Sequence, residues 1–150
     1  ISTLCKNTDN NCLVLLDYIE HGTNLYNYAK KICTNKKVYF IRGDVDIDER
    51  ERIRKYMESN DNVVCIAISK IFSTGVNIKN LHYLIFAGSG KAKIKTLQSI
   101  GRGLRKNKNK SRLVIFDMYD NLHYGRQHFE KRSTLYDKEN IEYKINVFNE

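Results

Sequence analysis

The chain has 150 residues, 41% of them hydrophobic and 29% charged, which suits one domain with its own core and excludes two. The formal net charge of +9 favours a polyanionic partner such as nucleic acid. No apolar run approaches the roughly 20 residues of a membrane span, no signal peptide is evident, and the cysteines lack metal-ligand spacing. We therefore expect an intracellular, cytoplasmic protein with reduced thiols, no metal site and no membrane segment.

Short apolar runs alternate along the chain with segments of helical periodicity. Residues 1–10 resemble the end of a helix, which suggests a fragment of a longer chain. Runs rich in β-branched and aromatic residues predict strands at 12–18, 38–41, 63–68, 83–87 and 112–118. Helical periodicity predicts helices at 22–34, 46–58, 91–106 and 121–138. The alternation at 141–148 predicts a closing strand, and the whole pattern predicts a mainly parallel sheet covered by helices on both faces.

In a parallel sheet of this kind, ligands bind at the carboxyl ends of the strands, so the residues that follow each strand are the candidates for function. Three such stretches carry polar, charged and glycine residues in unusual density. They are IRGDVDIDER at 41–50, SKIFSTGVNI at 69–78 and QSIGRGLR at 98–105.

The last of these stretches places four residues on one face of a helix. Gln98, Gly101, Arg102 and Arg105 stand at i, i+3, i+4 and i+7, within an arc of about 100°. Guanidinium groups a turn apart can hold a phosphoryl group and its developing charge, and Gly101, which lies between Gln98 and Arg102 on this face, has no side chain to block the approach. A surface helix with two solvated arginines is the alternative.

This Q-x-x-G-R-x-x-R pattern resembles motif VI of the superfamily 2 helicases and translocases, and 69–78 resembles their motif V. The resemblance implies that Arg102 and Arg105 act as arginine fingers on the γ-phosphate of ATP, with Gln98 nearby. It also implies that Gly75 and Asn77 approach the ribose and the metal region. Asn77 replaces a frequent aspartate, so it can form a hydrogen bond but supplies no charge.

The same resemblance implies a track for the nucleic-acid backbone. Ser69 and Thr74 of motif V would face the strand, and the main chain at Gly43 would approach it from the stretch after the second strand. Arg50 stands where the family has a later arginine, and an ordinary salt-bridging helix residue is an equal alternative. Residues 12–22 resemble the motif IV strand. The likeness to recombination helicases of this family implies branched or forked DNA as the partner.

A complete ATPase site is not evident in this chain. The sequence AGSGKAK at 87–93 contains a Gly-Lys pair, but Ile85 and Ala92 stand where a P-loop needs glycine and Ser/Thr. The resemblance therefore implies that residues 1–150 form the second, three-layer RecA-like α/β domain of a two-domain helicase. An amino-terminal RecA-like domain upstream would hold most of the ATP and Mg²⁺ contacts, and the isolated chain is expected to be inactive.

Two alternatives to this function stay open. One is a non-enzymatic basic nucleic-acid-binding domain that uses the lysine-rich loop at 105–112. The other is a translocase that moves on duplex without separating its strands. The sequence does not discriminate DNA from RNA by itself, although its Lys-, Asn- and Ile-rich composition suits an AT-rich phage or viral genome.

Overall fold

The computed structural model divides the chain into two compact units, Ile1–Met118 and Tyr119–Glu150. The residues that the structure describes are 1–71, 78, 80–88, 113–119, 123–138 and 140–146. None of the helices described there is long and apolar enough to cross a membrane.

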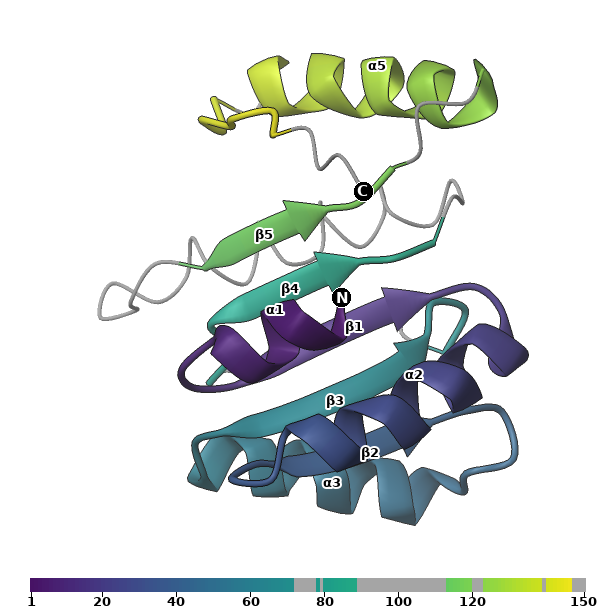
Figure 1. Cartoon of the computed structure of the whole chain (residues 1–150), viewed down its shortest axis with the longest axis vertical. Coiled ribbons are helices and arrows are strands. Elements are labelled where there is room, and N and C mark those ends of the chain that lie inside the picture. The colour runs from purple at the N-terminus through teal and green to yellow at the C-terminus, as the bar shows by residue number, and fades with distance from the viewer. Residues whose placement is uncertain (72–77, 79, 89–112, 120–122, 139, 147–150) are drawn as a thin grey trace. The chain divides into compact units, whose positions relative to one another are not determined.

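The first unit is built on a five-stranded parallel sheet with the order β2-β3-β1-β4-β5 (Figure 1). Its strands are β1 (Cys12–Leu16), β2 (Lys37–Ile41), β3 (Val63–Ile68), β4 (Tyr83–Phe86) and β5 (Val114–Asp117). Cys12 of β1 pairs with Val64 on one side and with Tyr83 on the other. The central strand is buried at every position, which explains why its sequence is continuously apolar rather than alternating.

Helices cover both faces of this sheet and make three layers (Figure 1). The helices α1 (Ser2–Asn7) and α2 (Ile19–Ile32) lie on one face, and α3 (Ile47–Ser59) lies on the other. The side chains of β2 show the division: Phe40 packs with Tyr26 of α2, whereas Tyr39 meets Tyr56 of α3 edge to face. The predicted parallel α/β arrangement is therefore confirmed for this unit.

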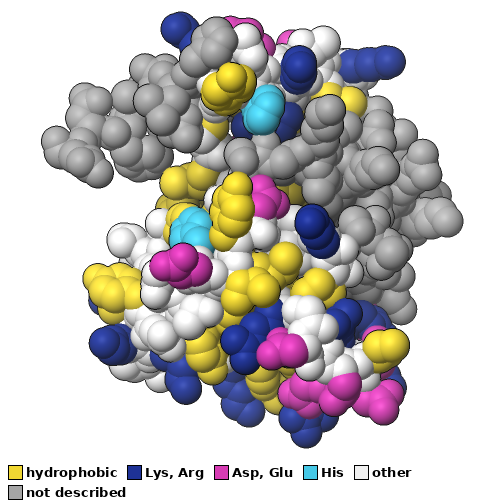
Figure 2. Space-filling view, turned by 90° about the vertical axis from the view of Figure 1, so that its right-hand side faces the viewer, with side chains coloured by type: hydrophobic (Ala, Val, Ile, Leu, Met, Phe, Trp, Pro, Cys, Tyr) yellow, Lys and Arg dark blue, Asp and Glu magenta, His cyan; other side chains and the backbone are white. Residues whose placement is uncertain are grey.

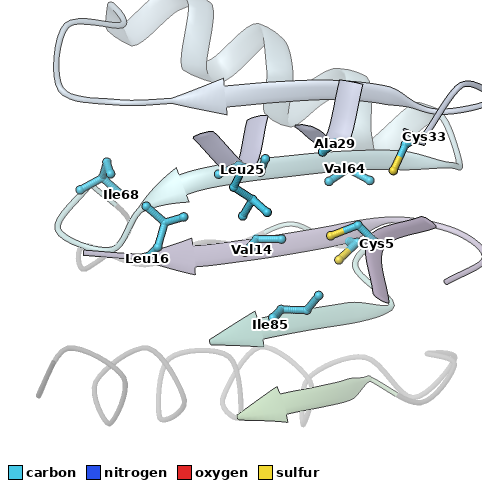
Figure 3. Close-up of a cluster of buried hydrophobic side chains, with 11 residues drawn as sticks. Cys5, Val14, Leu16, Leu25, Ala29, Cys33, Val64, Ile68 and Ile85 are labelled. Carbon is cyan, nitrogen blue, oxygen red and sulfur yellow. The ribbon is translucent and has the colours of Figure 1, made fainter. Parts of the chain in front are cut away.

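Alternate strand residues and one stripe of α2 form the core beneath the first helical layer (Figure 3). The buried positions of α2 are Gly22, Leu25 and Ala29, spaced as one helical face requires. A Cβ atom at Gly22 would lie 2.5 Å from the ring of Phe40, so even an alanine here would require the Phe40 ring to shift. All four cysteines are buried free thiols.

A buried asparagine connects three elements at the amino-terminal edge of the sheet. Asn11 is 0% exposed, and its Oδ1 accepts a hydrogen bond from the N–H group of Val63 at 2.9 Å. Its Nδ2 donates to the carbonyl oxygens of Met57, Asn60 and Asn80, at 2.7, 2.8 and 2.9 Å. The end of α3 and the start of β3 are thus fixed to the residue that precedes β1.

The second unit contains α5 (His123–Lys138) and a set of aromatic contacts. Tyr119 stacks on Phe129 with ring centroids 4.4 Å apart, and Tyr143 packs edge to face on Phe129 at 6.4 Å. The strand predicted at 141–148 is wrong for the residues described: positions 141–146 pair with no strand and are exposed. The alternation of Ile141, Tyr143 and Ile145 is present, but alternation alone does not supply a neighbouring strand.

Candidate functional site

The candidate site is the edge of the sheet where the parallel strands end. Because all five strands are parallel, the segments that follow β1, β2, β3 and β4 meet at one edge. Figure 2 views the molecule from this side, and basic, acidic and hydrophobic side chains are mixed on the coloured surface. Two of the predicted site residues, Gly43 and Ser69, lie there within the described part of the chain.

Gly43 occupies a tight turn between β2 and α3. The N–H group of Val45 donates to the carbonyl of Arg42 at 3.1 Å, which closes a β-turn over residues 42–45. Apart from its two chain neighbours, no described residue has an atom within 4 Å of a Cβ atom built on Gly43. The Cα of Gly43 is therefore unobstructed on this side by the described residues, and the backbone contact with nucleic acid that the resemblance implies here stays a prediction.

Arg50 fixes this turn from the first half of α3. Its Nε donates to the carbonyl of Val45 at 2.8 Å, and its Nη2 donates to the carbonyl of Gly43 at 3.0 Å. Asp46 caps α3 by accepting a hydrogen bond from the N–H group of Glu49 at 2.7 Å. Neither of the roles considered for Arg50 from the sequence included these main-chain bonds, because spacing alone gives no sign of them.

Ser69 lies directly after β3 and is almost fully buried, at 6% exposure. Its N–H group and its hydroxyl both donate to the carbonyl oxygen of Leu16, at 2.7 and 3.1 Å. These bonds join the exit of β3 to the exit of β1. A hydroxyl that donates to Leu16 has no second hydrogen for a phosphate, so direct donation to nucleic acid requires it to rotate.

A glycine and a carboxylate share the centre of the same edge. Gly88 follows β4, and a Cβ atom there would collide with the carboxylate of Asp17, which follows β1. Only glycine fits against Asp17 without displacing it. The sequence gives no sign of this contact, because Asp17 and Gly88 are 71 residues apart in the chain.

Six of the predicted site residues lie outside the described residues. They are Thr74, Gly75, Asn77, Gln98, Arg102 and Arg105. The predicted helix at 91–106 and the basic loop at 105–112 also fall in that part of the chain. Among the described residues, no group of three His, Cys, Asp or Glu side chains could hold a metal ion.

Comparison with known proteins identifies the family of this fold. Residues 1–107 match the family described as "Helicase conserved C-terminal domain". The chain belongs to this family. The matched region ends just after Arg105, so it includes all of the sequence motifs discussed above.

The chain is also similar to individual members of the family. It is 34% identical over 112 residues to the ATP-dependent DNA helicase uvsW of Enterobacteria phage T4, which is 75% of this chain and 22% of that protein. The crystal structure of T4 UvsW superimposes with a TM-score of 0.68 at 28% identity, covering 92% of this chain and 31% of that one. The C-terminal domain of the DEAD-box protein Dbp5 shares the fold, with a TM-score of 0.66 at 14% identity over 91% of this chain and 76% of that one.

These similarities confirm two of the sequence-based predictions. The domain resembles the C-terminal domains of superfamily 2 helicases, and its parallel sheet with flanking helices is that of RecA-like helicase domains. The chain spans less than a third of the UvsW chain that it matches.

Proposed function

We propose that this chain is the second motor domain of an ATP-dependent superfamily 2 helicase or translocase that acts on DNA. An amino-terminal RecA-like domain of the same polypeptide would hold most of the ATP and Mg²⁺ contacts. The partner is nucleic acid, with branched or forked DNA preferred, and the setting is intracellular. DNA is favoured over RNA because the relative at 34% identity is described as a DNA helicase.

The family match over residues 1–107 carries this proposal. It contains the glutamine and both arginines of QSIGRGLR in order, on a domain that has no P-loop sequence of its own. A domain that supplies arginines without a P-loop needs a second domain to bind the nucleotide. The open main chain at Gly43 supports the accompanying nucleic-acid contact.

In this proposal, Arg102 and Arg105 stabilise the negative charge that develops during phosphoryl transfer. Their planar, permanently charged groups suit phosphate oxygens, and arginine fingers in related enzymes raise turnover by about 10³–10⁵-fold. Gln98, Gly75 and Asn77 would contribute hydrogen bonds around the nucleotide. When bound between the two domains, ATP with Mg²⁺ would supply the phosphoryl group, the cleft would close on Arg102 and Arg105, and hydrolysis would let it reopen.

The nucleic-acid track in this proposal uses the exits of β2 and β3. Gly43 would offer its main-chain N–H group, and Thr74 its hydroxyl, to successive phosphates of one strand. Ser69 would order the exit of β3 through Leu16 and join the contact when its hydroxyl rotates. Contacts of this type do not discriminate sequence, as a motor that moves along DNA requires.

The test is the replacement of Arg102 or Arg105 by alanine in a polypeptide that carries both domains. DNA-stimulated ATP turnover should fall at least tenfold, while the affinities for ATP and DNA change far less, because a finger acts mainly on the transition state. Lysine should restore little activity, since it keeps the charge and loses the planar geometry. Arg52→Ala is the matched control, because that side chain is 77% exposed and pairs only with Glu49 among the contacts described.

Full turnover in both arginine variants would refute the finger assignment. The 150-residue chain alone should hydrolyse no ATP above background. Turnover that persists after repurification and disappears in Lys91→Ala would instead establish a P-loop site within this chain.

A further inference from the structure

We propose that Arg50 is a positioning residue for the nucleic-acid contact at Gly43. By fixing the central peptide of the turn, Arg50 directs the N–H group of Asp44 outward beside that of Gly43, as a second donor to a backbone phosphate. This inference rests on the proposed function, because it takes the nucleic-acid backbone as the ligand. It adds to that function one main-chain donor and the side chain that orients it.

The turn itself fixes the first of the two peptides. The carbonyl of Arg42 accepts the hydrogen bond from Val45, so it points into the turn. No described peptide is cis, and in a trans peptide the C=O and N–H groups point in opposite directions. The N–H group of Gly43 therefore points out of the turn, and no hydrogen bond from it is found among the described residues.

Arg50 fixes the second peptide by the same geometry. The carbonyl of Gly43 accepts from Nη2 of Arg50 at 3.0 Å, so the N–H group of Asp44, on the same peptide, points away from Arg50. That N–H group likewise has no partner among the described residues. In a type I turn, consecutive N–H groups face one side, as they do in the first turn of a helix that binds an anion.

The backbone angles of the turn show what Arg50 prevents. Rotation of the Gly43–Asp44 peptide would convert the turn to type II, which needs a positive φ at its third residue. Asp44 has no positive φ, and neither does Gly43. The bond from Arg50 to the carbonyl of Gly43 is lost in the rotated form, so Arg50 selects the form with both N–H groups outward.

Space and charge at the turn suit a phosphate. The position of a Cβ atom on Gly43 lies more than 4 Å from every described residue other than the two chain neighbours. The carboxylate of Asp44 would repel an anion, but it pairs with Nε of Arg42 at 2.9 Å, which reduces that repulsion. Two outward N–H groups beside a carboxylate that is paired with Arg42 form a weak anion site that a polyphosphate strand can use.

The experiment compares Arg50→Gln with Arg52→Gln in the ¹⁵N-labelled 150-residue chain. Both substitutions remove one positive charge from α3, but only Arg50 contacts the turn. Titration with a mixed-sequence single-stranded oligodeoxynucleotide should shift the amide resonances of Gly43 and Asp44 in the unaltered chain. Arg50→Gln should abolish the shift at Asp44 and weaken binding about tenfold, whereas Arg52→Gln should keep the shift at Asp44.

The dependence of affinity on salt separates positioning from direct contact. Main-chain N–H groups are uncharged and neutralise no phosphate, so their loss releases no fewer counterions from the oligonucleotide. Arg50→Gln should therefore give the same slope of log K against log salt as Arg52→Gln. A slope smaller by about one would mean that Arg50 itself binds phosphate, which overturns the proposal. Gly43→Val offers a second perturbation, because its Cβ atom would contact none of the described residues beyond its chain neighbours, and it should block the same two amide shifts.

Two further results distinguish this inference from the function on which it rests. An oligonucleotide that shifts other amides and leaves Gly43 and Asp44 unmoved overturns the role of the turn, while nucleic-acid binding by the domain stands. An oligonucleotide that shifts no amide overturns the nucleic-acid track of the isolated domain and the role of Arg50 together.

Discussion

Replacement of Asn11 by alanine should lower the free energy of unfolding by about 4 kcal/mol. The N–H group of Val63 loses its acceptor in a fully buried place, which costs about 2 kcal/mol. The carbonyls of Met57 and Asn60 keep only the longer bonds from Asn80, at 3.2 and 3.3 Å, so each loses about 1 kcal/mol. The sum is a large fraction of the roughly 5–15 kcal/mol that typically stabilises a domain.

Urea unfolding of the 150-residue chain, followed by circular dichroism, measures this loss. Asn27→Ala is the matched control, because that asparagine is exposed on α2 and the change should alter stability by less than about 0.5 kcal/mol. An Asn11→Ala loss below about 1 kcal/mol would show that the amino-terminal edge of the sheet does not depend on this side chain.

Three other properties are open to measurement. Gly22→Ala should destabilise the domain by about 1–2 kcal/mol in the same unfolding assay, because the clash with Phe40 outweighs the roughly 1 kcal/mol gain in helix propensity. Complete burial raises the pKa of Cys65 to about 12, so its thiol should stay unreactive toward iodoacetamide at neutral pH until the protein unfolds. Arg54 lowers the pKa of Glu51 through a hydrogen bond, so the small stabilisation from this partly exposed pair should be lost as the pH falls through that lowered pKa, and high salt should weaken it.

The sequence predicts the strands of the sheet well because short apolar runs rich in β-branched residues rarely form any other structure than a buried strand. The observed β3 coincides with the predicted run at 63–68, and β5 is shorter than predicted by two residues at its start and one at its end. The start of α2 is less well predicted, at residue 22 instead of Ile19. The helical periodicity indicates a helix only from residue 22, whereas Gly22 lies inside the helix and packs against the ring of Phe40.

The candidate site is predictable only in part for a physical reason. The position of Gly43 directly after β2 follows from the apolar run at 38–41 and from the family pattern at 41–50, and both can be read from neighbouring residues in the sequence. The bonds from Arg50 to the turn depend on the direction of individual carbonyl groups, which no spacing reveals. Gly88 and Asp17 are far apart in the chain, so their contact can be recognised only from the folded sheet, in which β1 and β4 are neighbours.

The position of β1 at the centre of the sheet has a consequence for how the domain folds. Cys12 of β1 pairs with Val64 of β3 and Tyr83 of β4, which are synthesised much later. A nascent chain therefore carries the wholly apolar strand β1 with both edges unpaired until β3 and β4 have been synthesised. Such distant pairings slow folding to roughly milliseconds or seconds and leave apolar edges exposed to aggregation in the meantime. A truncated chain that stops before Tyr83 would keep one of those edges permanently open, so the carboxyl-terminal boundary of any expressed version should lie well beyond β4.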